Sequence, residues 1–93
     1  MAVNQLIATL DCFKQEIILD VPGETVDGTF TAYFPDGSTQ SMAGVLPISL
    51  STSLGGEYTF IEDSINTGNS TVSSVLPVTL NAKFTDCANI SEL

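Results

Sequence analysis

The chain contains no histidine and no tryptophan, and its only basic residues are Lys14 and Lys83. Without histidine it lacks the commonest general base and the base of a serine triad, and its cysteines have no neighbour that would form a thiolate. It also lacks a phosphate-binding glycine loop, because no lysine follows Gly55 and Gly56. A glycoside-hydrolysing cleft would need aromatic walls, and the chain has no tryptophan to supply them. We therefore expect a protein that is not an enzyme and binds no cofactor.

Charged residues are scarce and almost all acidic. They make up 14% of the chain, against roughly 25% in ordinary soluble proteins, and the net charge is −9. Nucleic acids and anionic membranes need clustered lysine or arginine, so we expect neither as a partner. The surface must consist largely of hydroxyl, amide and apolar groups, which favours contact with other proteins. We expect self-association into a trimer or dimer.

Long apolar runs are also missing. No segment approaches the roughly 20 apolar residues of a membrane span. The first residues, "MAVNQLIATLDCF", lack the basic start and apolar stretch of a signal peptide. We expect a product made in the host cytoplasm, with 1–93 forming one domain and extended arms at 1–5 and 88–93.

Turn signals recur at short intervals along the chain. They are "VPGE" (21–24), "FPDG" (34–37), "LGGE" (54–57) and "NTGN" (66–69). The segments between them have strand length and are rich in β-branched and aromatic residues. Strands are also predicted at 4–11 and 14–21, where a short helix is the alternative. The pattern predicts an all-β fold, an antiparallel β-sandwich of about six to eight strands, either immunoglobulin-like or jelly-roll-like.

Two stretches thirty residues apart share the same motif, "AGVLPISLSTSL" (43–54) and "SSVLPVTLNAKF" (73–84). The offset also aligns Thr29-Phe30 with Thr59-Phe60, which predicts two similar hairpins stacked in one sandwich. Pro47 and Pro77 lack an N–H, so each should stand at a strand start, a bulge or an edge. Alternation in these stretches predicts a core of Leu46, Ile48, Leu50, Leu76, Val78, Leu80, Phe30, Phe60 and Phe84.

Two groups of residues are candidates for a bound ion or a covalent link. Asp20, Glu24 and Asp27 surround the Pro-Gly turn and have oxygens that Ca²⁺ prefers, although their spacing is not that of an EF-hand. Solvated loop carboxylates are the alternative. Cys12 and Cys87 either form a disulfide between the first and last strands or remain two buried apolar residues.

Candidate interface residues come from the aromatics and the C-terminal arm. Tyr33, Phe34 and Tyr58 could form a small aromatic patch for a protein or sugar, with core packing as the alternative. Ile90 and Leu93 are the apolar residues of the last segment. Added to a neighbouring sheet, such an arm would contribute to assembly.

The stretch "GTFTAYFPDGSTQSMAGVLPISLS" (28–51) resembles small all-β virion proteins of tailed bacteriophages, of the capsid decoration or cement type. The resemblance lies in composition and strand texture and assigns no functional residue. It implies a structural role in the virion, with the major capsid protein or another virion protein as partner.

Two alternatives remain open. A secreted or surface recognition module would work outside the cell and show ligand-facing aromatics and an oxidised Cys12–Cys87 pair. A head–tail joining protein would share the composition but form rings.

Overall fold

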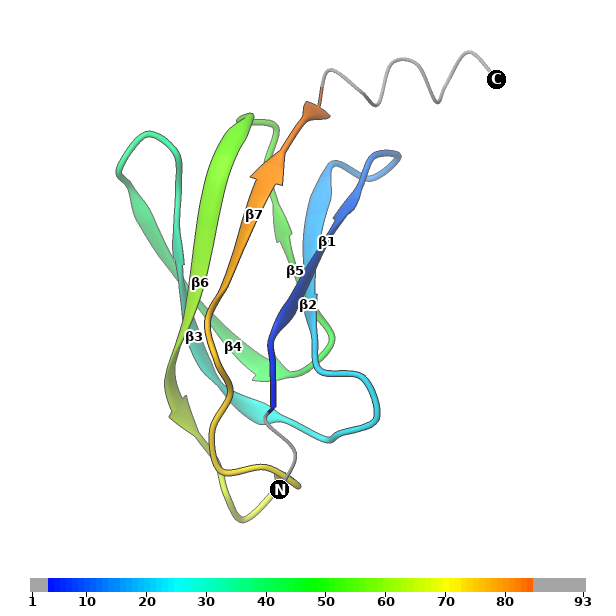
Figure 1. Cartoon of the computed structure of the whole chain (residues 1–93), viewed down its shortest axis with the longest axis vertical. Helices are drawn as coiled ribbons and strands as arrows, with labels where there is room; N and C mark the ends of the chain where they lie inside the picture. Colours follow the sequence, from blue (N-terminus) through cyan, green and yellow to red (C-terminus); the bar gives the residue numbers. More distant parts are fainter. Residues whose placement is uncertain (1–3, 85–93) are drawn as a thin grey trace.

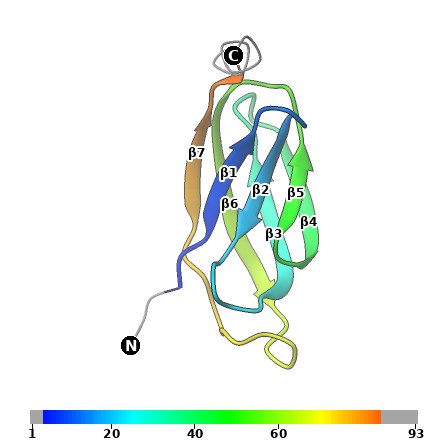
Figure 2. The same ribbon diagram turned by 90° about the vertical axis from the view of Figure 1, so that its right-hand side faces the viewer.

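The computed structural model describes residues 4–84, which form two packed antiparallel sheets and no α-helix. One sheet has the strand order β1-β2-β5 and the other β4-β3-β6-β7. Figures 1 and 2 show the two layers face to face, with β1 across from β7. The strands are β1 (Ile7–Asp11), β2 (Glu16–Asp20), β3 (Asp27–Tyr33), β4 (Thr39–Val45), β5 (Ile48–Ser51), β6 (Gly56–Ile65) and β7 (Val78–Ala82). The predicted all-β sandwich is confirmed.

Of the two arrangements expected for the sandwich, strand order and one side-chain contact are more similar to the immunoglobulin-like one. The first, second and fifth strands form one sheet, and the third, sixth and seventh lie in the other. The fourth strand extends the second sheet beside β3. At the start of β6 the Tyr58 hydroxyl donates to the Leu54 carbonyl over 2.5 Å, a contact similar to the tyrosine corner of such sandwiches. A jelly roll would need eight strands in two Greek keys.

The predicted turns form where glycine permits a positive φ. Gly23 has φ 82°, and the neighbouring Glu24 N–H donates to the Val21 carbonyl. Gly37 has φ 90° and donates to the Phe34 carbonyl in the hairpin between β3 and β4. Both conformations are strained for a residue with a Cβ.

The N-terminal segment is extended, and the strand prediction for it is confirmed. Before β1 the chain runs parallel to the segment that enters β7: the Leu76 N–H donates to Asn4 and the Leu6 N–H donates back to Leu76. Residues 4 and 5 belong to the expected N-terminal arm, and in the structure they lie in this short ladder. The expected C-terminal arm, 88–93, lies outside the described residues.

The core lies between the sheets and matches the predicted one in part. Its largest fully buried side chains are Tyr58, Phe30, Phe60, Leu6, Ile17, Leu19, Leu50 and Val26. Of the other predicted members, Leu46 is buried, whereas Ile48, Val78, Leu80 and Phe84 are partly buried against the core. The prediction that Leu76 belongs to the core is wrong, because 46% of the residue is exposed. Its backbone pairs with the N-terminal segment ahead of β7, so the inward alternation begins only at Val78.

The stacked-hairpin prediction is also wrong. Thr29-Phe30 and Thr59-Phe60 lie on β3 and β6, which pair side by side in one sheet. The strands after the two Val-Leu-Pro motifs lie at edges of different sheets, β5 in the smaller and β7 in the larger. Pro47 and Pro77 stand directly before these strands, as the missing N–H requires.

Candidate docking surface

Asp20 and Glu24 do not converge on a cation site. The Asp20 carboxylate accepts the N–H of Val21 over 2.8 Å. The Glu24 carboxylate accepts the hydroxyl of Thr71 over 2.9 Å. Within residues 4–84, no group of three or more His, Cys, Asp or Glu side chains is placed to hold a metal ion. The three carboxylates therefore do not come together as the candidate calcium site.

The third carboxylate of that set, Asp27, organises a loop. It accepts the side-chain amides of Asn66 and Asn69 over 3.3 and 3.2 Å. The Asp27 N–H donates to the Ser70 hydroxyl over 2.8 Å. These bonds tie the start of β3 to the connection between β6 and β7, so the role of Asp27 is structural.

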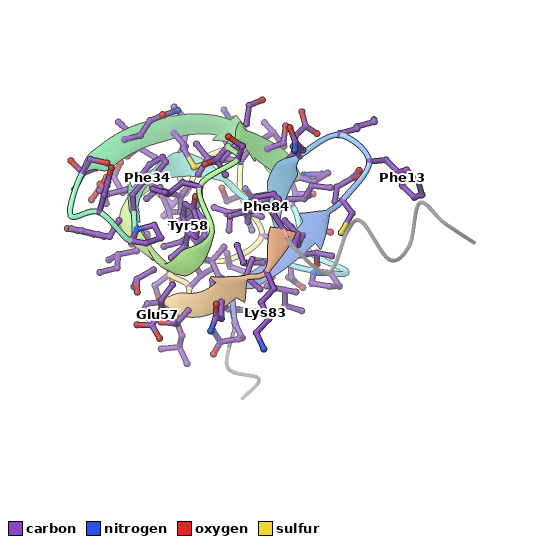
Figure 3. The ribbon with its side chains drawn as sticks, turned by 90° about the horizontal axis from the view of Figure 1, so that it is seen from above. Phe13, Phe34, Glu57, Tyr58, Lys83 and Phe84 are labelled. Atoms are coloured by element: carbon purple, nitrogen blue, oxygen red, sulfur yellow. The ribbon has the colours of Figure 1, made fainter. Side chains whose placement is uncertain are left out.

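The predicted aromatic patch is divided between the core and the surface. Tyr58 is buried, so its assignment to an interface is wrong; it shares the inward parity of Phe60. Phe34 is partly buried and packs on Tyr58 with ring centroids 5.2 Å apart, and Figure 3 shows the two side by side between the sheets. Only Tyr33 is exposed, on the outer side of β3. The alternative of core packing is confirmed for Tyr58.

Cys12 lies in the turn after β1 and is disulfide-bonded. Cys87, the residue with which the sequence could pair it, lies outside the described part of the chain. The candidate interface residues Ile90 and Leu93 lie outside it too.

The outer side of the four-stranded sheet carries mostly hydroxyl groups, and we call it the hydroxyl face. Alternation along each strand and the register between strands define its members. They are Asp27, Thr29, Thr31 and Tyr33 on β3, Thr39, Ser41, Ala43 and Val45 on β4, Glu57, Thr59, Ile61 and Ser64 on β6, and Thr79 and Asn81 on β7. The acids of this face, Asp27 and Glu57 together with Asp63 in the β6 bulge, lie outside its two central rows.

Two adjacent rows across the middle of this face contain no charged side chain. One row runs through Thr39, Tyr33, Thr59 and Thr79, and the next through Ser41, Thr31 and Ile61. The register places Ile61 diagonal to Tyr33, within reach of a large side chain.

Hydroxyls on this face bond across the strands. The hydroxyl oxygens of Thr29 and Ser64 lie 2.8 Å apart, and those of Thr59 and Thr79 lie 3.2 Å apart. Thr31 donates to the carboxylate of Asp63, an acid in the bulge of β6 where the register with β3 shifts. These bonds hold the side chains in fixed positions, which lowers the entropy lost on docking.

The outer side of the three-stranded sheet has a different character, and we call it the acidic face. It carries Asp11, Glu16 and Asp20 among Ile7, Thr9, Ile18, Ser49 and Ser51. Asp11 and Glu16 stand directly opposite each other, an arrangement of like charges that is costly to desolvate. This face is therefore suited to remain in water, and the hydroxyl face is the better candidate for docking.

Phe13 is an exposed aromatic that sequence reasoning missed. It is 81% exposed in the turn between β1 and β2 and points away from the body of the protein in Figure 3. The Asp11 carboxylate accepts the N–H groups of Phe13 and Lys14 over 3.1 and 3.2 Å. An aspartate that closes its own turn was the available signal, since "DCFKQ" fits that pattern.

No protein-family model, curated protein or solved structure matches the chain. In the part of the chain that the structure describes there is no pocket, and no helix has the length and apolar character to cross a membrane.

Proposed function

We propose that this protein is a non-enzymatic structural protein that docks on another protein through its hydroxyl face. The observation that carries the proposal is the pair of uncharged central rows with Tyr33 and Ile61 exposed between hydroxyls. Interface cores are depleted of charge and enriched in tyrosine, because buried charges lose their hydration. The hydroxyls of the central rows make such a surface specific without adding charge.

The specific role that fits best is a decoration or cement protein on the capsid of a tailed bacteriophage. Such a protein must stay soluble and then attach by one side. The net charge of −9 and the acidic face supply solubility, while the hydroxyl face supplies the attachment surface. The partner would be the major capsid protein or another virion protein, and the protein would reside in the virion.

A pair of isoleucines offers a matched test. Ile61 on the hydroxyl face is 38% exposed, and Ile7 on the acidic face is 43% exposed. Purified protein would be sedimented with capsid particles from its own source. We expect Ile61→Lys to weaken binding about tenfold or more, because a charge enters the desolvated interface. Ile7→Lys, with the same change in charge, should bind as the wild type does.

Two results would refute the docking proposal. One is wild-type protein that does not bind the particles. The other is equal binding by the two lysine variants. Circular dichroism and urea unfolding of both variants would establish that each keeps the fold.

A second candidate, an extracellular recognition module, is favoured by the tip of the β1–β2 turn. Phe13 is exposed there beside the disulfide-bonded Cys12, and disulfides persist in oxidising surroundings, virion surfaces included. A glycan or cell-surface binding signal that Phe13→Ala abolishes and Ile61→Lys retains would favour this candidate. A head–tail joining protein would instead form closed rings visible in electron micrographs of the purified protein.

A further inference from the structure

We infer that β4 is an edge through which two copies of this chain pair, antiparallel, into one continuous sheet. In residues 4–84, β4 hydrogen-bonds to β3 alone and lies at the opposite edge of its sheet from β7, as Figure 2 shows. This edge is the surface for self-association, and the pairing requires no capsid partner.

The hydrogen-bond register identifies which backbone groups of β4 are open. β3 and β4 pair without a register shift along the whole ladder, from Asp27 opposite Val45 to Tyr33 opposite Thr39. Just beyond its two ends, the Phe34 N–H donates to Ser38 and the Leu46 N–H donates to Val26. Because hydrogen-bonded pairs alternate in an antiparallel ladder, the even-numbered residues of β4 bond to β3. The N–H and C=O groups of Thr39, Ser41, Ala43 and Val45 therefore point to the open edge.

The other three edges have protection that β4 lacks. β7 lies between Pro77 and Lys83, and the Gln5 side chain donates to the carbonyls of Leu76 and Pro77. β1 ends in Asp11, and β5 has only four residues. Proline, charge and shortness are the usual means of blocking edge pairing.

β4 has none of these means. Its seven residues, "TQSMAGV", include no charged side chain and no proline, and all but Met42 and Gly44 are exposed. A second strand can therefore approach without burying an unpaired charge.

The geometry gives one preferred register. With a two-fold axis at Met42, Ser41 faces Ala43 of the second copy and Thr39 faces Val45. Every odd-numbered residue then meets an odd-numbered residue, so all the open backbone groups of both strands are satisfied. The facing pairs are small or β-branched and uncharged, which suits close cross-strand contact.

Charge sets the strength of this pairing. Each copy carries −9, so two copies repel at long range, while the edge itself is neutral. A single-strand contact buries less surface than the roughly 1,200 Å² of a stable interface. We therefore expect a weak dimer that added salt strengthens by screening the repulsion.

Sedimentation equilibrium in half-molar salt tests the inference at concentrations up to millimolar. The wild-type mass should rise with concentration from 9.8 kDa toward twice that value. Ser41→Pro should remain a monomer, because it removes an N–H that only the dimer uses and adds a ring at the contact. Ala43→Glu should also remain a monomer, whereas Thr79→Glu, with equal charge at the β7 edge, should dimerise.

Amide hydrogen exchange supplies a readout that depends on the parity of the residues. Raising the concentration should slow exchange at Thr39, Ser41, Ala43 and Val45 and leave Gln40 and Met42 unchanged. A wild-type chain that stays monomeric, or a Ser41→Pro variant that dimerises equally, would overturn the inference. Ile61→Lys lies away from the edge and should dimerise normally, so loss of capsid docking and loss of dimerisation are separable.

Discussion

The two strands that follow the Val-Leu-Pro motifs contribute to the core very differently. β5 belongs to the three-stranded sheet, and its Leu50 is only 1% exposed. β7 is an edge of the four-stranded sheet, and Leu80, at the corresponding position, is only partly buried. The same alternation thus specifies an extended strand with one apolar side. It does not specify how much of that side becomes covered.

The difference begins at the leucine of each motif. The Leu46 N–H donates to Val26, which keeps that leucine beside β3 and turned into the core. The Leu76 backbone instead bonds to Asn4 and Leu6, outside the four-stranded sheet. Contacts with distant segments decide where each copy lies, and the local sequence decides only that each forms a strand.

Truncating the corresponding leucines should give the largest effect. We expect Leu50→Ala to lower the free energy of unfolding by about 2–5 kcal/mol, through lost transfer energy and a cavity. Leu80→Ala should cost about 1–2 kcal/mol, because water already reaches part of the side chain. Urea unfolding of both variants measures the difference. Equal losses would contradict the unequal burial of the two copies.

The residue before each Thr-Phe pair gives the next comparison. Before Thr59-Phe60 it is Tyr58, whose ring fills the core. Before Thr29-Phe30 it is Gly28, where an added Cβ would clash with the Ser64 carbonyl oxygen. Since that oxygen is backbone, β3 and β6 must separate to admit a methyl group. We expect Gly28→Ala to destabilise the fold by about 1–3 kcal/mol.

Gly68→Ala is the matched control for this substitution. Its nearest neighbour would be 3.6 Å away, an ordinary contact with a side chain. Urea unfolding should place it within about 0.5 kcal/mol of the wild type. Similar losses in the two alanine variants would refute the close approach at Gly28.

Much of the fold could be predicted from the sequence because its signals are local. The Pro-Gly turn at Gly23, the hairpin turn at Gly37 and the alternation in β7 each depend on a few adjacent residues. The burial of Tyr58 could also have been predicted, since it lies two residues before Phe60 on the same side of β6.

The rest depends on contacts distant in the sequence. Glu62 has the inward parity of Phe60, which no alternation rule explains. The structure resolves this conflict with a register shift beside Asp63 and a hydrogen bond from the Val75 N–H to the Glu62 carboxylate over 2.8 Å. The hydroxyl face was also missed, because its rows combine residues from four strands whose register only the fold defines.

The smallest expected effect concerns the turn residues Asp36 and Asn66, which align at the thirty-residue offset of the sequence repeat. The Ser38 hydroxyl and N–H both donate to the Asp36 carboxylate, over 2.6 and 2.9 Å. These bonds favour the ionised form and lower the pKa of Asp36 from its ordinary 3.8, the hydroxyl having the larger effect. Asn66 carries no charge, so of these two aligned turn positions only Asp36 titrates.

A lowered pKa in the folded state adds stability above pH 3.8, and that stability is lost as the pH falls through the folded value. Ser38→Ala should therefore return the pKa of Asp36 toward 3.8, measured by NMR titration of its carboxyl carbon. The variant should be slightly less stable than the wild type near pH 7, and the two should converge in acid. Because Asp36 is exposed, the difference should remain small. An unchanged titration of Asp36 in Ser38→Ala would show that the turn hydroxyl does not control its charge.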